Sequence, residues 1–95
     1  MHSAATYEVA MMGFTPGFAY LTGLDPQLVV SRRAVPRTSV PSGSVAVAGP
    51  YTAVYPRESP GGWNLIGRIA DAVMFDVDRG PLLALGDRVR FERVP

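Results

Sequence analysis

The chain has 95 residues, which is enough for one domain and too short for two. Hydrophobic residues make up 47% and charged residues 18%, so the composition excludes a disordered or highly charged polypeptide. There is no Cys, every basic residue is Arg, and the net charge is only +1. These features exclude thiol and lysine chemistry and disfavour broad electrostatic binding of nucleic acids or membranes.

Short apolar runs separated by Gly and Pro indicate an all-β chain. The runs have the length of strands rather than helices, and turn signals recur about every ten residues. Asp25 followed by Pro26 has the pattern of a helix N-cap and first helical residue, and it predicts one short helix through Val30. The sequence therefore predicts one domain over residues 1–95, a sandwich or closed β-barrel with at most one short helix. We expect strands at residues 7–11, 44–48, 52–55, 64–69, 72–76 and 88–92.

Several features argue against particular kinds of site. The only histidine, His2, is expected in a frayed N-terminal segment, so neither a histidine triad nor a histidine-rich metal site is expected. Asp76 and Asp78 are spaced as in a solvated turn rather than as metal ligands. No phosphate loop, dinucleotide motif or nucleophile elbow is present. The start of the chain lacks a signal-peptide pattern, and we expect a cytoplasmic location.

A glycine-rich loop follows the first expected strand. Gly13 and Gly17 permit backbone angles and close approaches that a side chain would prevent, and Pro16 stiffens the turn between them. The spacing of Phe14, Phe18 and Tyr20 is compatible with one face of an extended segment. The loop is either a corner of the fold with core aromatics or a rigid element that presents an aromatic wall to a ligand.

An arginine-containing segment lies before the second expected strand. Arg32, Arg33 and Arg37 surround Pro36, and an extended, proline-stiffened segment suits capture of a carboxylate or phosphate by arginine. A solvated basic strand edge is the alternative. We expect Arg37 to be the functional residue because it stands beside Pro36. The hydroxyl groups of the segment that would add hydrogen bonds belong to Ser42 and Ser44.

A third candidate segment contains the only tryptophan. Pro60, Gly61 and Gly62 precede Trp63, and Asn64 follows it with an amide that both donates and accepts hydrogen bonds. In one interpretation Trp63 is buried in the core behind a tight turn. In the other, the two glycines leave the surface open for a partner, and the indole ring is partly exposed in the isolated domain.

Four ordered motifs resemble those of the allophanate hydrolase subunit 1 family. This family includes the B subunit of the bacterial ATP-dependent 5-oxoprolinase, an inhibitor of a sporulation histidine kinase, and the related carboxyltransferase part of urea carboxylase. The resemblance runs from about residue 7 to residue 91, nearly the whole chain. The motifs are Gly-Phe-x-Pro-Gly-Phe-x-Tyr-Leu at 13–21, Pro-Arg-x-x-Val-Pro-x-Gly-Ser-Val at 36–45, Tyr-Pro-x-x-Ser-Pro-Gly-Gly-Trp at 55–63 and Leu-Leu-x-x-Gly-Asp-x-Val-x-Phe at 82–91.

The resemblance implies a cyclophilin-like closed β-barrel, without the N-terminal α+β domain that family members usually carry. It also implies a subunit of an ATP-dependent amide hydrolase of the 5-oxoprolinase or allophanate hydrolase type. Such a subunit would share an active site with a homologous second subunit, of the allophanate hydrolase subunit 2 type. An amidohydrolase-like third subunit would be needed for 5-oxoproline cleavage, and ATP would serve the assembled complex.

The roles implied for single residues are binding roles. Arg37, Ser42 and Ser44 would contact anions, while Tyr20 and Trp63 would form the walls of the pocket. No catalytic residue is identified, no cofactor motif is recognised, and the isolated chain is expected to be inactive. A regulatory module that binds a histidine kinase is the alternative function. A prolyl isomerase is a third, although a shared barrel type alone does not transfer activity.

Overall fold

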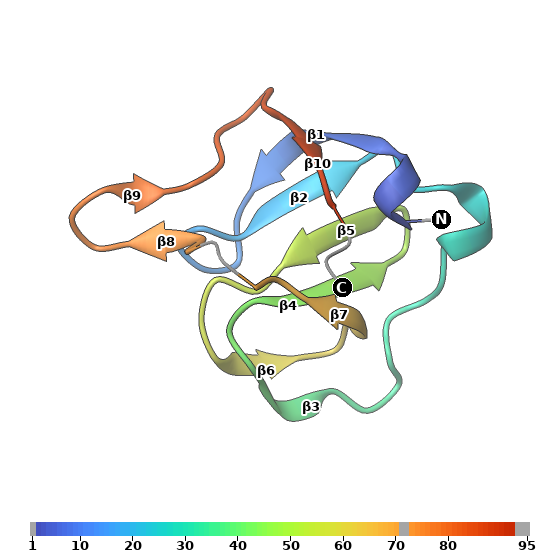
Figure 1. The fold of residues 1–95 in the computed structure, drawn as a ribbon. Coiled ribbons are helices and arrows are strands. Elements are labelled where there is room, and N and C mark those ends of the chain that lie inside the picture. The colour runs from blue at the N-terminus through green and yellow to red at the C-terminus, as the bar shows by residue number, and fades with distance from the viewer. Residues whose placement is uncertain (1, 71–72, 93–95) are drawn as a thin grey trace.

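The chain forms an all-β fold, as the sequence predicts. The computed structural model describes residues 2–70 and 73–92, which contain ten strands, two single-turn 3₁₀ helices and no α-helix (Figure 1). The helices are η1 (His2–Ala4) and η2 (Pro26–Leu28). The strands are β1 (Thr6–Met12), β2 (Ala19–Thr22), β3 (Arg37–Val40), β4 (Ser44–Ala48), β5 (Tyr51–Val54), β6 (Ser59–Gly61), β7 (Asn64–Arg68), β8 (Phe75–Asp76), β9 (Gly80–Pro81) and β10 (Arg88–Arg90).

Six strands form the main antiparallel sheet, in the order β10-β1-β2-β5-β4-β7. Among the described strands, β10 and β7 are the two ends of this order and do not pair with each other. The predicted closed barrel is therefore not shown. Two smaller antiparallel ribbons pair β3 with β6 and β8 with β9. Figure 1 shows the β8–β9 ribbon extending away from the main sheet, and the β3–β6 ribbon lying beyond β4 and β7.

The strand predictions differ in how closely they match. The strand at residues 44–48 is confirmed with its predicted bounds, because Gly43 and Gly49 turn the chain with positive φ angles of 82° and 53° at its two ends. All five residues of β4 are buried, since β5 and β7 flank it in the sheet. The expected strand at 72–76 is shorter, starting at Phe75, and its first residue lies outside the described residues. The sequence analysis did not predict β2, β3, β6 or β9.

The helix predictions need two corrections. Asp25 does cap η2, since its Oδ1 accepts a hydrogen bond of 2.9 Å from the Gln27 N–H, but η2 ends at Leu28 rather than Val30. Val30 instead forms an isolated β-bridge with Gly49, and the Gly49 N–H donates to the Val30 carbonyl at 2.6 Å. The second helix, η1, was not expected, because the segment around His2 was predicted to be frayed.

Side-chain contacts hold η1 against the sheet. The His2 ring packs on Tyr7 and Phe91, with centroids 5.0 Å and 4.8 Å away, and its Nε2 lies 2.9 Å from the Thr52 hydroxyl. The Tyr7 hydroxyl donates a 2.6 Å hydrogen bond to the His2 carbonyl. The prediction of a frayed segment is therefore wrong, because a ring with three partners in the sheet offsets the chain entropy lost on ordering.

The core falls into clusters on the two faces of the central strands. The cluster that matters for the candidate site contains Phe18, Val40, Tyr55 and Trp63 with three alanines of β4 and β5. A second cluster is built on Tyr7 and Val9 of β1. Small alanines on the central strands leave space that the large rings of the neighbouring loops fill.

Candidate functional site

The described part of the chain contains a pocket of about 780 Å³. We call it the aromatic pocket, because five aromatic side chains contribute to its walls. Its volume lies within the range of about 300–1,000 Å³ typical of ligand sites. Its other walls come from residues 48–50 and 60–62 and from Ser31, Arg32 and Pro36. The five aromatic residues are Phe14, Tyr20, Tyr51, Tyr55 and Trp63.

Phe18 organises the aromatic rings from beneath the pocket. It is 1% exposed, and its centroid lies between 5.1 and 5.4 Å from the rings of Phe14, Tyr20, Tyr55 and Trp63, each in an edge-to-face arrangement. Edge-to-face pairs at this spacing place the positive ring edge against the negative ring face and add to the stability gained by burial. The pocket wall is therefore fixed by packing before any ligand binds.

Tyr55 is the most buried of the wall residues, with 1% of its surface exposed. Burial raises the pKa of its hydroxyl above the ordinary value of 10.0, while a hydrogen bond from the Trp63 backbone and the charge of Arg32 act in the opposite direction. The net increase keeps the hydroxyl protonated at neutral pH. Tyr55 is therefore able to donate a hydrogen bond, and it is not a general base under those conditions.

Arg32 is held at the rim of the aromatic pocket by its neighbours in the chain. The Asn64 side-chain amide donates to the Ser31 carbonyl at 2.8 Å, and the Arg33 N–H donates to the Gly62 carbonyl at 2.7 Å. The Arg32 guanidinium lies over Gly62, with Nε and Nη2 both 3.7 Å from the position that a Cβ would take there. Hydrogen bonds on both sides of Arg32 therefore fix its backbone, while its exposed side chain stays available.

The structure brings together two of the six predicted binding residues, with three of the predicted loop residues. Tyr20, Trp63, Pro60, Gly61 and Gly62 all line the aromatic pocket. Trp63 is only 7% exposed, so the predicted partial exposure of its ring is wrong. The reason is the edge-to-face packing of the indole on Phe18 and Tyr20, which buries it whether or not a partner is present.

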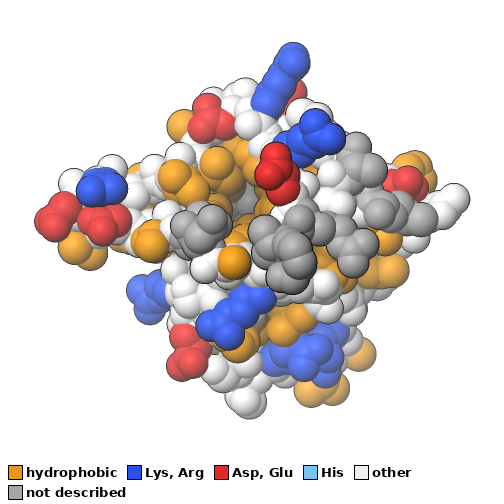
Figure 2. Space-filling view, in the orientation of Figure 1, with side chains coloured by type: hydrophobic (Ala, Val, Ile, Leu, Met, Phe, Trp, Pro, Cys, Tyr) orange, Lys and Arg blue, Asp and Glu red, His pale blue; other side chains and the backbone are white. Residues whose placement is uncertain are grey.

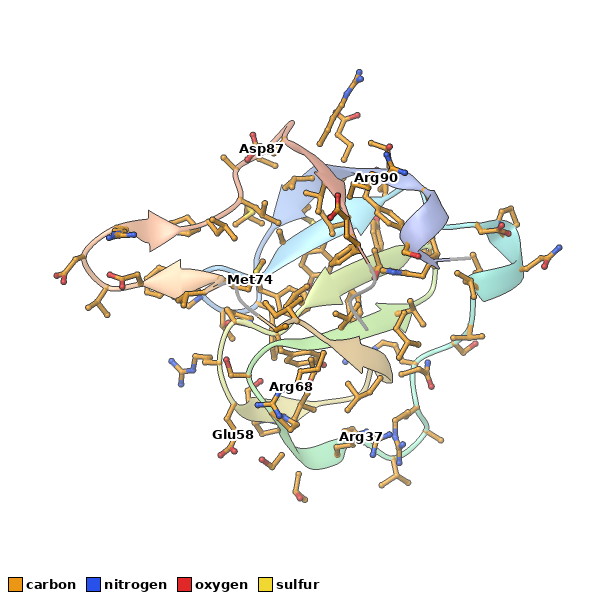
Figure 3. The ribbon with its side chains drawn as sticks, in the orientation of Figure 1. Arg37, Glu58, Arg68, Met74, Asp87 and Arg90 are labelled. Carbon is orange, nitrogen blue, oxygen red and sulfur yellow. The ribbon has the colours of Figure 1, made fainter. Side chains whose placement is uncertain are left out.

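The other predicted residues lie outside the lining of the aromatic pocket. Ser44 is buried and donates to the Pro41 carbonyl at 2.7 Å, and exposed Ser42 donates to the Pro56 carbonyl at 3.2 Å. Asn64 donates to the carbonyls of Ser31 and Val47, so its amide supports the fold. Arg37 lies on the β3–β6 ribbon (Figure 3), and its Nε is buried without a hydrogen-bond partner.

Gly13, Pro16 and Gly17 line a second hollow, of about 500 Å³, together with Phe75 and Pro81 of the β8–β9 ribbon. Gly17 has φ of +84°, and a Cβ there would lie 2.6 Å from the Phe75 Cβ, so this position requires glycine. The predicted loop is therefore a corner of the fold that carries Phe14 to the aromatic pocket.

Figure 2 shows charges of both signs at the tip of the β8–β9 ribbon and basic side chains over the position of β3.

Acidic side chains do not form a metal site in the part of the chain that the structure describes. Within residues 2–70 and 73–92, no group of three or more His, Asp or Glu side chains is arranged to hold a metal ion. Asp76 instead caps a turn, since its Oδ1 accepts from the N–H groups of Asp78 and Arg79 at 2.8 and 3.2 Å. The same residues contain no helix that is long and apolar enough to cross a membrane.

Residues 1–85 match the family model of the carboxyltransferase domain, subdomain C and D, and the chain belongs to this family. It is similar to the B subunit of 5-oxoprolinase from Haemophilus influenzae, with 50% identity over 93 residues that cover 96% of this chain and 43% of that protein. It is 43% identical over 95 residues to the corresponding B subunit from Bacillus subtilis, covering 99% of this chain and 40% of that protein.

A solved structure also resembles the chain. The conserved uncharacterized protein PH0987 from Pyrococcus horikoshii matches with a TM-score of 0.90 and 43% identity, covering 98% of this chain and 44% of that one. The family predicted from four sequence motifs is therefore confirmed. The chain spans less than half the length of these relatives, at 40–44%.

Several residues of the aromatic pocket were missed as site residues, and the two that matter for its chemistry are Arg32 and Tyr55. Arg32 was considered only as part of a basic segment, and Tyr55 only as the end of a strand. The sequence held no signal for Arg32, because its loop is held by a hydrogen bond between Asn64 and Ser31, which are 33 positions apart. Such a contact has no local pattern in the sequence. For Tyr55, the combination of a strand-terminal tyrosine with a glycine pair shortly after it was a usable signal.

Proposed function

We propose that this chain is part of a 5-oxoprolinase-type, ATP-dependent amide hydrolase and that its aromatic pocket forms one wall of a shared active site. The observation that carries the proposal is the identity of 43–50% to B subunits of 5-oxoprolinase over at least 96% of the chain. The partners in this proposal are a homologous second subunit and an amidohydrolase-like third subunit. A cytoplasmic location and the family's cyclophilin-like closed barrel belong to the same proposal.

The chemistry of the pocket supports this role. Opening a five-membered lactam with water is uphill enough to need ATP, which would activate the amide oxygen by phosphorylation. The intermediate then carries negative charge, which fixed cations and hydrogen-bond donors stabilise best when water is excluded. On this chain, the protonated Tyr55 hydroxyl supplies one such donor at the aromatic pocket, where Arg32 is the cation that a negatively charged part of the substrate would meet.

The partners would supply what the chain lacks. The lining of the aromatic pocket contains no carboxylate and no histidine among the described residues. A general base for the attacking water would therefore come from another subunit, and so would the groups that bind ATP. In this proposal the isolated chain binds part of the substrate and does not turn it over.

Co-purification with the homologous second subunit, followed by an ATPase assay with and without 5-oxoproline, tests the proposal. We expect ATP hydrolysis to depend on 5-oxoproline in the assembled complex and to be absent from the chain alone. A complex that assembles but whose ATPase ignores 5-oxoproline would refute the substrate. Turnover by the repurified chain alone would refute the shared site.

A further inference from the structure

Among the described residues that line the aromatic pocket, Arg32 is the only one with a charged side chain. Its neighbour Arg33 turns away, since Arg33 Nε donates to the Val35 carbonyl at 3.3 Å. The pocket thus combines a single positive charge with walls of aromatic rings and proline. A site of this composition favours a ligand with one negative charge and an otherwise compact, apolar body.

The Arg32 guanidinium is suited to a carboxylate in particular. A carboxylate has one charge and two coplanar oxygens, and these match two parallel N–H groups of arginine in a bidentate pair. A phosphate carries about two charges at neutral pH and is commonly held by more than one cation or by a cluster of backbone N–H groups. One guanidinium on an aromatic wall therefore fits a carboxylate better.

The glycine pair brings Tyr55 and Arg32 to neighbouring positions on the pocket wall. A Cβ on Gly61 would collide with the Tyr55 hydroxyl, and the Arg32 guanidinium lies over Gly62. A ring placed in the pocket beside this wall therefore has its substituent within reach of Arg32. Tyr20 and Trp63 line the same pocket.

We propose that Arg32 binds the carboxylate of a small cyclic carboxylic acid whose ring lies in the aromatic pocket, beside Gly61 and Gly62. This inference rests on the proposed function for its choice of 5-oxoproline as the main ligand. It assigns substrate recognition to Arg32 rather than to Arg37. Asn64 acts as a positioning residue, because its hydrogen bond to the Ser31 carbonyl holds the backbone next to Arg32.

The test is an NMR titration of the 95-residue chain with three probes. 5-Oxoproline has the lactam and the carboxylate, 2-pyrrolidinone has only the lactam, and cyclopentanecarboxylate has only the ring and the carboxylate. We expect both carboxylates to bind and 2-pyrrolidinone to bind about tenfold or more weakly, as expected for the loss of a charge-assisted hydrogen bond. Arg32→Gln should weaken both carboxylates by a similar factor, and Arg32→Lys should restore only part of the loss.

Arg33→Gln is the matched control, because it changes the adjacent arginine in the same loop and should leave all three affinities unchanged. Thermal unfolding of each variant checks that it folds as stably as the unmodified chain, as expected for changes of exposed side chains. If Arg32→Gln binds 5-oxoproline as tightly as the unmodified chain, the inference is overturned. It is also overturned if no carboxylate binds, or if 2-pyrrolidinone binds equally well.

The outcomes also separate this inference from the proposed function. Binding of cyclopentanecarboxylate through Arg32 without binding of 5-oxoproline would keep the carboxylate site and remove 5-oxoproline as the substrate. A complex that hydrolyses 5-oxoproline with an unchanged KM in the Arg32→Gln variant would keep the proposed function and remove the role of Arg32.

Discussion

The hydroxyl group of Tyr55 occupies the space that a side chain at Gly61 would need. A Cβ built on Gly61 would collide with the Tyr55 hydroxyl oxygen and would lie 2.8 Å from the ring Cζ. Tyr55 is buried at the end of β5, and Gly61 belongs to β6, so the two residues join the main sheet to the β3–β6 ribbon. Glycine at this position therefore serves packing, and it also sets one wall of the aromatic pocket.

Gly61→Ala should destabilise the chain by about 1–3 kcal/mol, the usual cost of overpacking a well-filled site. The new methyl group must displace either the Tyr55 ring or the β6 backbone. Gly67→Ala is the matched control, because a Cβ there would meet only the Val45 Cβ at 4.0 Å. Urea unfolding of both variants checks the prediction, and equal midpoints for the two would contradict the collision.

Trp63 should behave as a core residue. It is 7% exposed and packs edge-to-face on Phe18 and Tyr20 at 5.4 and 5.7 Å. Trp63→Ala should therefore cost about 3–5 kcal/mol of unfolding free energy, as large-to-small changes in cores do. Trp63→Phe keeps an aromatic edge in place and should cost less.

Fluorescence of the same residue gives an independent measurement. As the only tryptophan, it should emit at short wavelength in the folded chain and shift to long wavelength on unfolding. Iodide should quench it weakly before unfolding and strongly afterwards. Long-wavelength emission that iodide quenches in the folded chain would place the indole ring at the surface instead.

Local patterns were sufficient for the fold class and for the central strand. In β4 an apolar run lies between two glycine turns, so both its existence and its ends could be predicted. In β6 the sequence Ser59-Pro60-Gly61 has almost no strand propensity. It is extended because β3 pairs with it, which is a tertiary contact with no local signal.

The candidate site divides in the same way. Tyr20, Trp63 and the glycine pair were predicted because rings and glycines in motifs indicate walls and open backbone. The argument for Arg37 was local and used only its neighbour Pro36, whereas the structure places Arg32, and not Arg37, in the lining of the aromatic pocket. The loop of Arg32 is held there by hydrogen bonds to residues 62 and 64, a contact between distant parts of the chain that only the folded structure supplies.

Arg37 should contribute little to stability through its charge. Its Nε is buried without a hydrogen-bond partner, and such a donor costs about 1–3 kcal/mol of desolvation. Arg37→Met keeps an apolar stem of similar length and removes the donor, so the variant should be as stable as the unmodified chain or up to about 1 kcal/mol more stable. Arg57→Met, at an exposed position, is the control and should change stability by less than about 0.5 kcal/mol.

Urea unfolding measures these differences, and the 5-oxoproline titration described above measures binding in the same variants. A loss of stability larger than about 1 kcal/mol in Arg37→Met would mean that the guanidinium makes interactions that outweigh its buried Nε. A loss of 5-oxoproline binding without a loss of stability would return Arg37 to the role that the sequence predicted.

His2 should make the stability of the chain depend on pH. The Thr52 hydroxyl donates its hydrogen to the Ala46 carbonyl at 2.8 Å, so at 2.9 Å it accepts from His2, whose Nε2 must carry the proton. In the neutral imidazole, Nδ1 is therefore the unprotonated nitrogen, and the ring packs against Tyr7 and Phe91. Burial lowers the pKa of His2 below its ordinary value of 6.5, because the charged ring is poorly solvated there.

The direction of the effect follows from this shift. Above 6.5 the ring is neutral in both the folded and the unfolded chain, and its contribution to stability is fully present. As the pH falls below 6.5, the unfolded chain takes up a proton first, so stability is lost until the pH passes the lowered pKa of the folded state.

Urea midpoints measured from about pH 7.5 to about pH 5 should therefore fall for the unmodified chain. His2→Gln keeps an amide donor for Thr52 but does not titrate, so its midpoints should fall less over the same range. If both proteins lose stability in parallel, carboxylates elsewhere in the chain cause the acid sensitivity and His2 does not.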